Sequence, residues 1–317
     1  MDSIGMDRKW KRELSKNLTR LEDIREALEI PPDEERVLRG VLARHPMSIT
    51  RYYFSLIDPS DPDDPIRKMI VPATGEIRDA GGSYDASLES RITRMRGVQH
   101  KYPQTALVLV TNRCAAYCRY CFRKRLVGLD GEEMIRRFSG AADYIREHPE
   151  INNVLLTGGD SFMLDSPVIG EILGELDDIP HLDFVRFGTR TPVTFPGRIN
   201  LDPELPRTIG RYSNPERRIY VVTHFNHPRE ITAESRAAVD ALISAGAIVN
   251  NQSVLLAGVN DDPATLAELQ NGLVGIGINP YYLFQCRPVK RVKNCFQVPL
   301  ARGYRIVETA PGMMNAD

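Results

Sequence analysis

Residues 110–125 read VTNRCAAYCRYCFRKR, which places cysteines at positions 114, 118 and 121. The apolar run 106–110 predicts a strand, so the cysteines lie on a loop that leaves this strand. Three thiols spaced by three residues and then two can converge on one soft metal centre. We therefore expect the chemistry of this protein at this loop.

The ligand chemistry of the loop favours an iron–sulfur cluster, which is ordinarily held by cysteine thiolates. Three cysteines leave one iron of a four-iron four-sulfur cluster open to a molecule that is not protein. A structural zinc ion needs a fourth side chain, usually from a second Cys or His pair. The next histidine is His148, beyond a predicted helix. The sequence predicts Cys114, Cys118 and Cys121 as cluster ligands.

Cysteines in a reducing compartment can alternatively serve as small buried hydrophobic residues. That role does not explain why three of the five cysteines fall within eight positions and are followed at once by Arg123, Lys124 and Arg125. The clustering indicates a metal site more strongly than a disulfide framework.

Outward from this loop, apolar runs alternate with amphipathic stretches, a pattern typical of βα units around a parallel sheet. The predicted strands are 106–110, 154–157, 184–188, 219–223, 248–256 and 281–285, and the predicted helices are 132–146, 168–176, 204–212, 233–245 and 264–274. Six units instead of the usual eight predict an α/β fold with an incomplete TIM-type barrel. Active sites of such folds gather at the carboxyl ends of the strands.

The chain before the barrel predicts a helical subdomain over residues 1–60. Apolar residues recur there at helical spacing, at Leu14, Leu18, Leu21, Ile24 and Leu28. A Pro- and Asp-rich stretch over 58–65 cannot sustain regular structure. We expect residues 61–102 to wrap the core as a connector, 103–290 to form the partial barrel and 291–317 to form a C-terminal tail.

Composition bounds the class of protein. At 317 residues, with 42% hydrophobic and 26% charged residues, the chain is typical of globular proteins. No apolar run approaches the roughly 20 residues of a spanning helix, and the start lacks the apolar segment of a signal peptide. Lys and Arg number 41 against 42 Asp and Glu, which argues against bulk nucleic-acid binding. We expect a cytoplasmic protein that binds neither membrane nor nucleic acid.

Polar clusters follow the predicted strands. Gly158, Gly159 and Asp160 end the second one, where glycines allow close backbone approach and a carboxylate can accept from an ammonium group. Taken alone, these residues are also ordinary turn chemistry. His224 and His227, two of six histidines, end the fourth strand, a placement that favours a binding role as much as a structural one.

The cysteine spacing, with an aromatic residue before the last cysteine, resembles the radical S-adenosylmethionine (SAM) enzymes. Further segments make the chain similar to lysine 2,3-aminomutase and its relatives, in order between about residues 10 and 308. These segments are YCRYCFR (117–123), TGGD (157–160), RTPV (190–193), THFNHP (223–228), NQSVLL (251–256) and YYLFQC (281–286).

The resemblance implies a partial barrel of the radical SAM kind. In that superfamily the open iron chelates the amino and carboxylate groups of SAM, and one electron cleaves SAM to a 5'-deoxyadenosyl radical. The cofactor then carries the hard chemistry, while the protein orients it and excludes water. Expected partners are a small amino-acid substrate and an electron donor such as flavodoxin or ferredoxin.

Residue by residue, the resemblance places Gly158, Gly159 and Asp160 in the segment that cradles SAM, and His224 and Gln252 near it. Arg123 matches the arginine that pairs with the substrate carboxylate, a task suited to a planar fork. Lys101 matches an arginine near the pyridoxal phosphate (PLP) of the family.

Two positions depart from the lysine enzymes. After Gln-Cys those enzymes carry an aspartate that holds the distal ammonium of the substrate, whereas this chain has Arg287. Because arginine repels ammonium and attracts carboxylate or phosphate, we expect a substrate other than lysine. The PLP-binding lysine of the family lies in a later Gly-rich segment, and neither Lys290 nor Lys293 matches it. We expect either a shortened form or a relative without covalent PLP.

The main hypothesis is therefore an aminomutase-like isomerase of the radical SAM class. The alternatives are a PLP-independent radical SAM enzyme modifying another substrate, and a non-catalytic remnant that binds a cluster without turnover. The strand edge that the later segment would cover favours a homo-oligomer.

Overall fold

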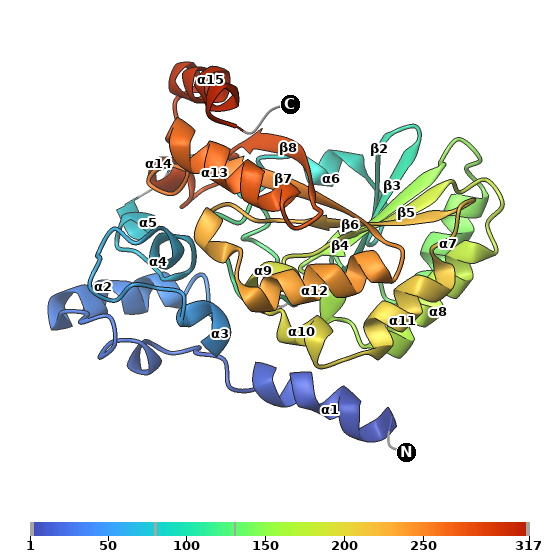
Figure 1. Ribbon diagram of the computed structural model, residues 1–317, viewed down its shortest axis with the longest axis horizontal. Coiled ribbons are helices and arrows are strands. Elements are labelled where there is room, and N and C mark those ends of the chain that lie inside the picture. Colours follow the sequence, from blue (N-terminus) through green and yellow to red (C-terminus); the bar gives the residue numbers. More distant parts are fainter. Residues whose placement is uncertain (1–2, 79–80, 130, 315–317) are drawn as a thin grey trace.

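The computed structural model describes residues 3–78, 81–129 and 131–314, and its centre is one eight-stranded sheet with the strands in chain order (Figure 1). The strands are β1 (Thr93–Met95), β2 (Val98–Tyr102), β3 (Thr105–Thr111), β4 (Asn153–Gly158), β5 (Phe184–Gly188), β6 (Arg218–Thr223), β7 (Ile248–Leu255) and β8 (Asn279–Gln285). β1 to β3 pair antiparallel, whereas β3 to β8 pair in parallel. The linear order leaves the sheet open, which confirms the predicted incomplete barrel.

Crossover helices surround the outside of the curved sheet (Figure 1). They are α7 (Phe138–Arg146), α8 (Ser166–Asp177), α11 (Glu204–Tyr212), α12 (Ala233–Ser244) and α13 (Pro263–Val274). Alternation along β5 shows the two faces, because Val185 and Phe187 are buried while Arg186 on the opposite face is half-buried. The buried face belongs to a hydrophobic cluster that extends from Leu18 to Phe296. The N-terminal region from Leu18 onward therefore shares one core with the sheet, whereas Trp10 packs in a smaller cluster with Ala115, Met163 and Phe195.

The N-terminal region differs from the predicted helix over residues 14–28. Its helices are α1 (Ser3–Leu14), η1 (Leu21–Asp23), α2 (Pro32–Leu42) and α3 (Arg51–Phe54). Leu18 instead exchanges backbone hydrogen bonds with Ile49, at 2.8 and 3.0 Å. This pairing replaces helical hydrogen bonds, while Leu18 remains buried as the apolar pattern predicted.

Residues 132–137 also differ from the predicted helix 132–146, because α7 begins only at Phe138. The Ile135 amide donates to the Leu109 carbonyl at 3.0 Å, and Arg96 Nε donates to the Met134 carbonyl at 2.8 Å. These bonds hold the segment extended beside β3.

The connector contributes short helices and two strands of the sheet. Its helices are α4 (Pro65–Ile70), α5 (Gly75–Arg78) and α6 (Glu89–Ile92), and they precede the β1–β2 hairpin. Ser83 pairs with Val289 in the segment after β8. The connector thus contacts the segment that follows the last strand of the open barrel.

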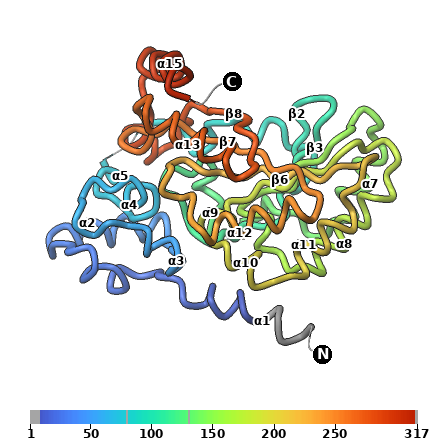
Figure 2. The backbone as a smooth tube through the Cα atoms, viewed as in Figure 1, coloured from blue at the N-terminus to red at the C-terminus, as the bar shows by residue number. Residues whose placement is uncertain are grey.

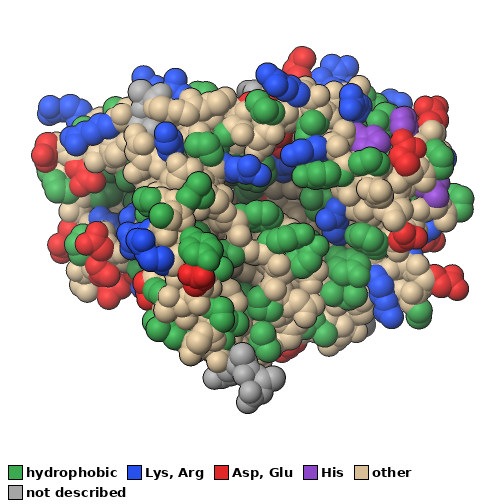
Figure 3. Space-filling model, turned by 90° about the horizontal axis from the view of Figure 1, so that it is seen from above, with side chains coloured by type: hydrophobic (Ala, Val, Ile, Leu, Met, Phe, Trp, Pro, Cys, Tyr) green, Lys and Arg blue, Asp and Glu red, His purple; other side chains and the backbone are tan. Residues whose placement is uncertain are grey.

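The remaining short elements lie at the carboxyl ends of the strands or after β8. They are η2 (Ser161–Met163), α9 (Thr191–Thr194), α10 (Gly197–Asn200), η3 (Pro228–Glu230), α14 (Lys293–Phe296), α15 (Leu300–Thr309) and η4 (Ala310–Met313). α1 and α15 lie on opposite sides of the molecule (Figure 2). Seen from above the view of Figure 1, the surface is hollowed near its centre, with Lys and Arg side chains around the hollow (Figure 3). Among the described residues, no helix has both the length and the apolar character needed to cross a bilayer.

Candidate functional site

Backbone bonds to the end of β4 position the cysteine loop. The Gly159 amide donates to the Thr111 carbonyl at 2.5 Å, and the Asp160 amide donates to the Arg113 carbonyl at 2.8 Å. Gly158 has φ +123°, a conformation that side chains disfavour, and a Cβ on Gly159 would stand 2.3 Å from the Arg113 oxygen. Both glycines are required for this close approach, which brings Asp160 next to Cys114.

Replacing Gly159 with alanine tests this approach. The added methyl group meets backbone atoms of Asn112 and Arg113, directly before Cys114, so we expect a loss of about 1–3 kcal/mol in unfolding free energy and lower iron content after reconstitution. Denaturant titration and iron analysis measure the two effects. Gly312→Ala is the control, because nothing lies within 4 Å of its added Cβ. Equal iron content in both variants would contradict the packing argument.

The three candidate ligands are half-buried thiols in the same loop. Cys114, Cys118 and Cys121 form no disulfide. Burial raises the pKa of Cys121 to about 11 and the pKa of Cys114 well above its usual value, and the neighbouring thiols add to both shifts. The metal-free thiols of Cys114 and Cys121 are therefore protonated at neutral pH, and binding a metal there must release protons.

The donor set fits an iron–sulfur cluster, since it offers three sulfurs from one loop that lie near enough to influence one another electrostatically. Within the part of the chain that the structure describes, no group of three His, Cys, Asp or Glu side chains is placed as ligands of a single metal ion. The assignment of these cysteines as cluster ligands stays a prediction.

A buried glutamate from the connector neutralises two cations of the cysteine loop. Glu76 accepts from Arg119 Nε at 2.8 Å and Nη2 at 2.6 Å, and from Lys124 Nζ at 2.6 Å. Burial and the neighbouring Arg119 lower the pKa of Lys124 to about 8, although Glu76 opposes that shift. Lys124 also donates to the carbonyls of Arg119 and Arg291, which joins the loop to the segment after β8.

A second buried glutamate, Glu89, holds the next two cations. Arg123 donates from Nε to Glu89 Oε1 at 2.8 Å and from Nη1 to Thr157 Oγ1 at 3.0 Å, while Arg125 reaches Glu89 Oε2 at 2.8 Å. A substrate carboxylate bound by Arg123 would share that guanidinium with Glu89. The role of Arg123 in substrate binding stays a prediction.

Asp160 ties the ends of β4 and β5 together. Its carboxylate accepts from Thr189 Oγ1 and from the Arg190 amide, both at 2.6 Å, and from the Phe162 amide at 3.1 Å. Burial raises the pKa of this carboxyl, and these hydrogen bonds oppose the shift. Its side chain therefore orders the loops around the cysteines, whereas contact with SAM stays a prediction.

His224 lies at the end of β6 and stacks on Tyr120 of the cysteine loop, with ring centroids 5.7 Å apart. Burial and the neighbouring Arg190 lower the pKa of His224 to about 3, against a hydrogen bond to the Gln252 backbone. His224 is therefore neutral at physiological pH and can accept or donate a hydrogen bond. Gln252, half-buried on β7, neighbours His224 through that backbone contact. The expected place of both residues near SAM stays a prediction.

Polar residues of β7 hold the loop that carries His224. Asn251 Oδ1 accepts from the Phe225 amide at 2.7 Å, and Ser253 Oγ donates to the Phe225 carbonyl at 2.9 Å. Asn226 Nδ2 donates to Tyr120 Oη at 2.6 Å. The ends of β6 and β7 and the cysteine loop thus form one hydrogen-bonded unit.

Two predicted site residues lie further out. Arg287 follows β8 directly, and its side chain is exposed. Lys101 is exposed on β2, with Nζ 5.2 Å from the Tyr102 ring centroid. The structure brings neither side chain to the cysteines by a contact among the described residues.

Sequence reasoning missed three buried acidic residues of this site, Glu76, Glu89 and Glu230. For the first two the signal available was the excess of cations in residues 119–125, since buried charges require partners, whereas Glu230 pairs with Arg190. That signal predicts that carboxylates exist but not which ones, because all three lie more than 30 residues away from the cations they hold.

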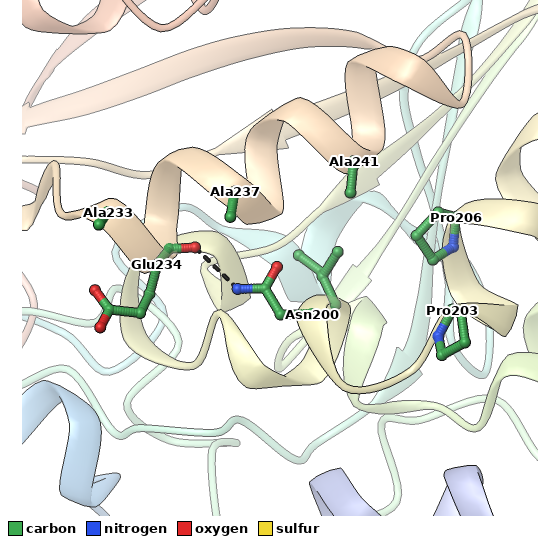
Figure 4. Close-up of a pocket in the computed structure, with 8 residues that line it drawn as sticks. Asn200, Pro203, Pro206, Ala233, Glu234, Ala237 and Ala241 are labelled. Carbon is green, nitrogen blue, oxygen red and sulfur yellow. Dashed lines mark hydrogen bonds between the residues drawn. The ribbon is translucent and has the colours of Figure 1, made fainter.

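A separate groove lies between α12 and the stretch from the end of α10 to the start of α11 (Figure 4). Its lining is mostly apolar and includes Pro203, Pro206 and Ala237, and Asn200 donates to the Glu234 carbonyl at 3.0 Å on its wall. It belongs to the outer helical layer and contains none of the predicted site residues.

No protein-family model matches the chain. It is 38% identical over 305 residues to the L-lysine 2,3-aminomutase of Clostridium subterminale, covering 96% of this chain and 72% of that protein. It is 37% identical over 305 residues to the glutamate 2,3-aminomutase of Clostridioides difficile, covering 96% and 70%. A solved radical SAM methyltransferase from Sphaerobacter thermophilus aligns over 68% of this chain and 65% of that chain, with a TM-score of 0.42 and 18% identity.

An open parallel barrel with a C-x3-C-x2-C loop after its first parallel strand defines the radical SAM class of enzymes. The identities above extend over most of both chains. The chain belongs to the lysine 2,3-aminomutase family, whose members are isomerases. The predicted family and enzyme class are confirmed.

Proposed function

We propose that this protein is a radical SAM 2,3-aminomutase whose substrate is an acidic amino acid instead of lysine. The observation that carries the choice of substrate is Arg287, an exposed cation at the carboxyl end of β8. Within the described residues its guanidinium has no ion pair, so it is available to a carboxylate. A relative named glutamate 2,3-aminomutase supports an acidic substrate.

Cys114, Cys118 and Cys121 would hold a four-iron four-sulfur cluster, and Gly158, Gly159, His224 and Gln252 would line the SAM site beside it. When bound, the cluster and SAM supply a carbon radical that abstracts hydrogen from the substrate. The protein's own task is positioning: the glycines allow close approach, and neutral His224 offers a hydrogen bond without adding charge. An electron-transfer protein such as flavodoxin or ferredoxin would supply the electron.

Neither lysine after β8 has the setting of the PLP-binding lysine of the family. Lys290 lies over the Tyr84 ring at 5.5 Å, Lys293 is exposed, and neither stands in a Gly-rich segment.

We also propose that the protein self-associates through β8. Tyr281, Tyr282 and Phe284 on this strand are 48%, 50% and 38% exposed, and an open strand edge with apolar side chains favours pairing. Sedimentation of the purified protein tests this, and a monomer at all concentrations would contradict it.

Arg287→Asp tests the choice of substrate. We expect the ratio of glutamate to lysine turnover to fall at least about tenfold, equivalent to about 1.4 kcal/mol, because the variant replaces attraction for a carboxylate by repulsion. The measurement is 5'-deoxyadenosine and amino-acid product formed by anaerobically reconstituted, reduced protein with SAM. Lys293→Asp makes the same charge change at another exposed position of the same segment. Preference of the wild-type protein for lysine would contradict the proposal, as would absence of 5'-deoxyadenosine with either substrate.

A further inference from the structure

Arg190 makes the most direct contact between a charged side chain and a candidate cluster ligand. Its Nη1 donates to Cys118 Sγ at 2.8 Å, although the two residues are 72 positions apart. Nε donates to the His224 carbonyl at 3.1 Å, and the Arg190 amide donates to Asp160. From its place after β5, Arg190 therefore contacts the segments that follow β3 and β6 through its guanidinium and the segment that follows β4 through its backbone amide.

The charge of Arg190 is buried and fixed. Nη2 donates to Glu230 Oε1 at 2.6 Å and to Tyr53 Oη at 3.0 Å, and the guanidinium carbon lies 5.2 and 5.5 Å from the ring centroids of Tyr53 and Tyr120. Glu230 is fixed in turn by the amides of Asn226 and His227, at 2.6 and 3.0 Å. Since a buried ion pair is costly to assemble and adds little stability relative to apolar packing, its place beside a sulfur points to a role at that sulfur.

We propose that Arg190 is a positioning residue that raises the reduction potential of a cluster held by Cys118, through the N–H that it donates to the sulfur. The inference rests on the proposed function for the presence of that cluster. Reduction adds one electron from a one-electron donor, which is oxidised by one electron, and no bond is made or broken in the protein. The reduced state is more negative by one charge.

Physical reasons give the sign of the effect. Hydrogen bonds to cluster sulfurs and nearby net charge set the potential of iron–sulfur clusters. A donated N–H and a fixed positive charge stabilise the more negative reduced state, and low local polarity strengthens both terms. Glu230 acts in the opposite direction, because its carboxylate offsets the guanidinium charge.

The experiment is an anaerobic redox titration of reconstituted full-length protein, with the reduced cluster followed by electron paramagnetic resonance in the absence of SAM and substrate. For Arg190→Gln we expect the equilibrium constant for one-electron reduction to fall at least tenfold, which is 59 mV. Arg190→Lys keeps the charge and should recover part of the shift. Glu230→Gln keeps Arg190 and should move the potential upward.

Arg217→Gln is the matched control, because Arg217 donates to the carbonyls of Leu176, Asp177, Ile179 and Leu182 near the amino end of β6. It removes a comparably bonded arginine from the edge of the sheet opposite the cysteine loop and should leave the potential unchanged. If Arg190→Gln binds as much iron as the wild type and its cluster has the same reduction potential, the proposal is overturned. If Arg190→Gln does not bind iron, the reduction potential of Glu230→Gln is the test. A potential equal to that of the wild type in Glu230→Gln overturns the proposal.

Failure of the proposed function gives a different result. If the reconstituted wild-type protein contains no iron–sulfur signal, the cluster assignment itself is wrong. If it contains the signal but rearranges no amino acid, the substrate proposal fails while the potentials of the Arg190 variants still test this inference.

Discussion

Alanine at Cys114, Cys118 or Cys121 is expected to abolish both cluster binding and SAM cleavage. Each substitution removes one of only three sulfurs on the loop, and a cluster with two protein ligands is not retained. The measurements are iron and sulfide per chain, the brown absorption, and 5'-deoxyadenosine formed with SAM and reductant. All three should fall to the level of protein that was never given iron.

Cys295→Ala is the control for this prediction. Cys295, in the segment after β8, is also a half-buried thiol without a disulfide, and it lies beside Gly75 of α5. Its replacement should leave the iron content and the nucleoside yield at the wild-type level. Persistence of colour and nucleoside in any of the three loop variants would show that the loop does not hold the cluster.

Removing the carboxylate of Glu76 has the second largest expected effect. Glu76→Ala leaves Arg119 and Lys124 buried without their shared anion, and breaking a buried pair from one side costs about 3–5 kcal/mol. We expect a correspondingly lower free energy of unfolding in denaturant. Because this pair anchors the cysteine loop to the connector, iron content after reconstitution should fall as well.

The loss of stability in the same variant should also depend on pH, because of Lys124. In the wild type its pKa in the folded protein is about 8, below the usual 10.5. Without Glu76 the pKa of Lys124 in the folded protein falls further. Folded Glu76→Ala protein therefore loses the Lys124 proton at a lower pH than folded wild type, and above that pH its unfolded chain binds more protons than its folded state, so its stability rises with pH. The stability deficit of Glu76→Ala should therefore shrink as pH rises toward 8.

Glu76→Gln separates charge from shape. It keeps two hydrogen-bonding atoms at the site but removes the negative charge, so its unfolding free energy should lie between wild type and Glu76→Ala. Equal stability of all three proteins from pH 6 to 8 would show that the buried pair is not needed to hold the loop.

Local sequence was sufficient to predict the parallel strands and the cysteine loop. Runs such as 154–157 and 219–223 are short and mostly apolar, and such a run is recognised from neighbouring residues alone. The helix expected over residues 14–28 was wrong because Leu18 pairs with Ile49, a contact that helical spacing does not contain. Apolar residues were placed in the core correctly even where the secondary structure was not.

The sequence by itself determined that three thiols stand at the end of a parallel strand, since ligand type and spacing are properties of one short segment. Only the tertiary structure decided which anions hold the cations of that segment and which donor reaches a sulfur. Glu76, Glu89 and Arg190 come from distant parts of the chain. These side chains reach the cysteine loop because the ends of separate strands converge in the folded protein, and no local sequence pattern predicts that contact.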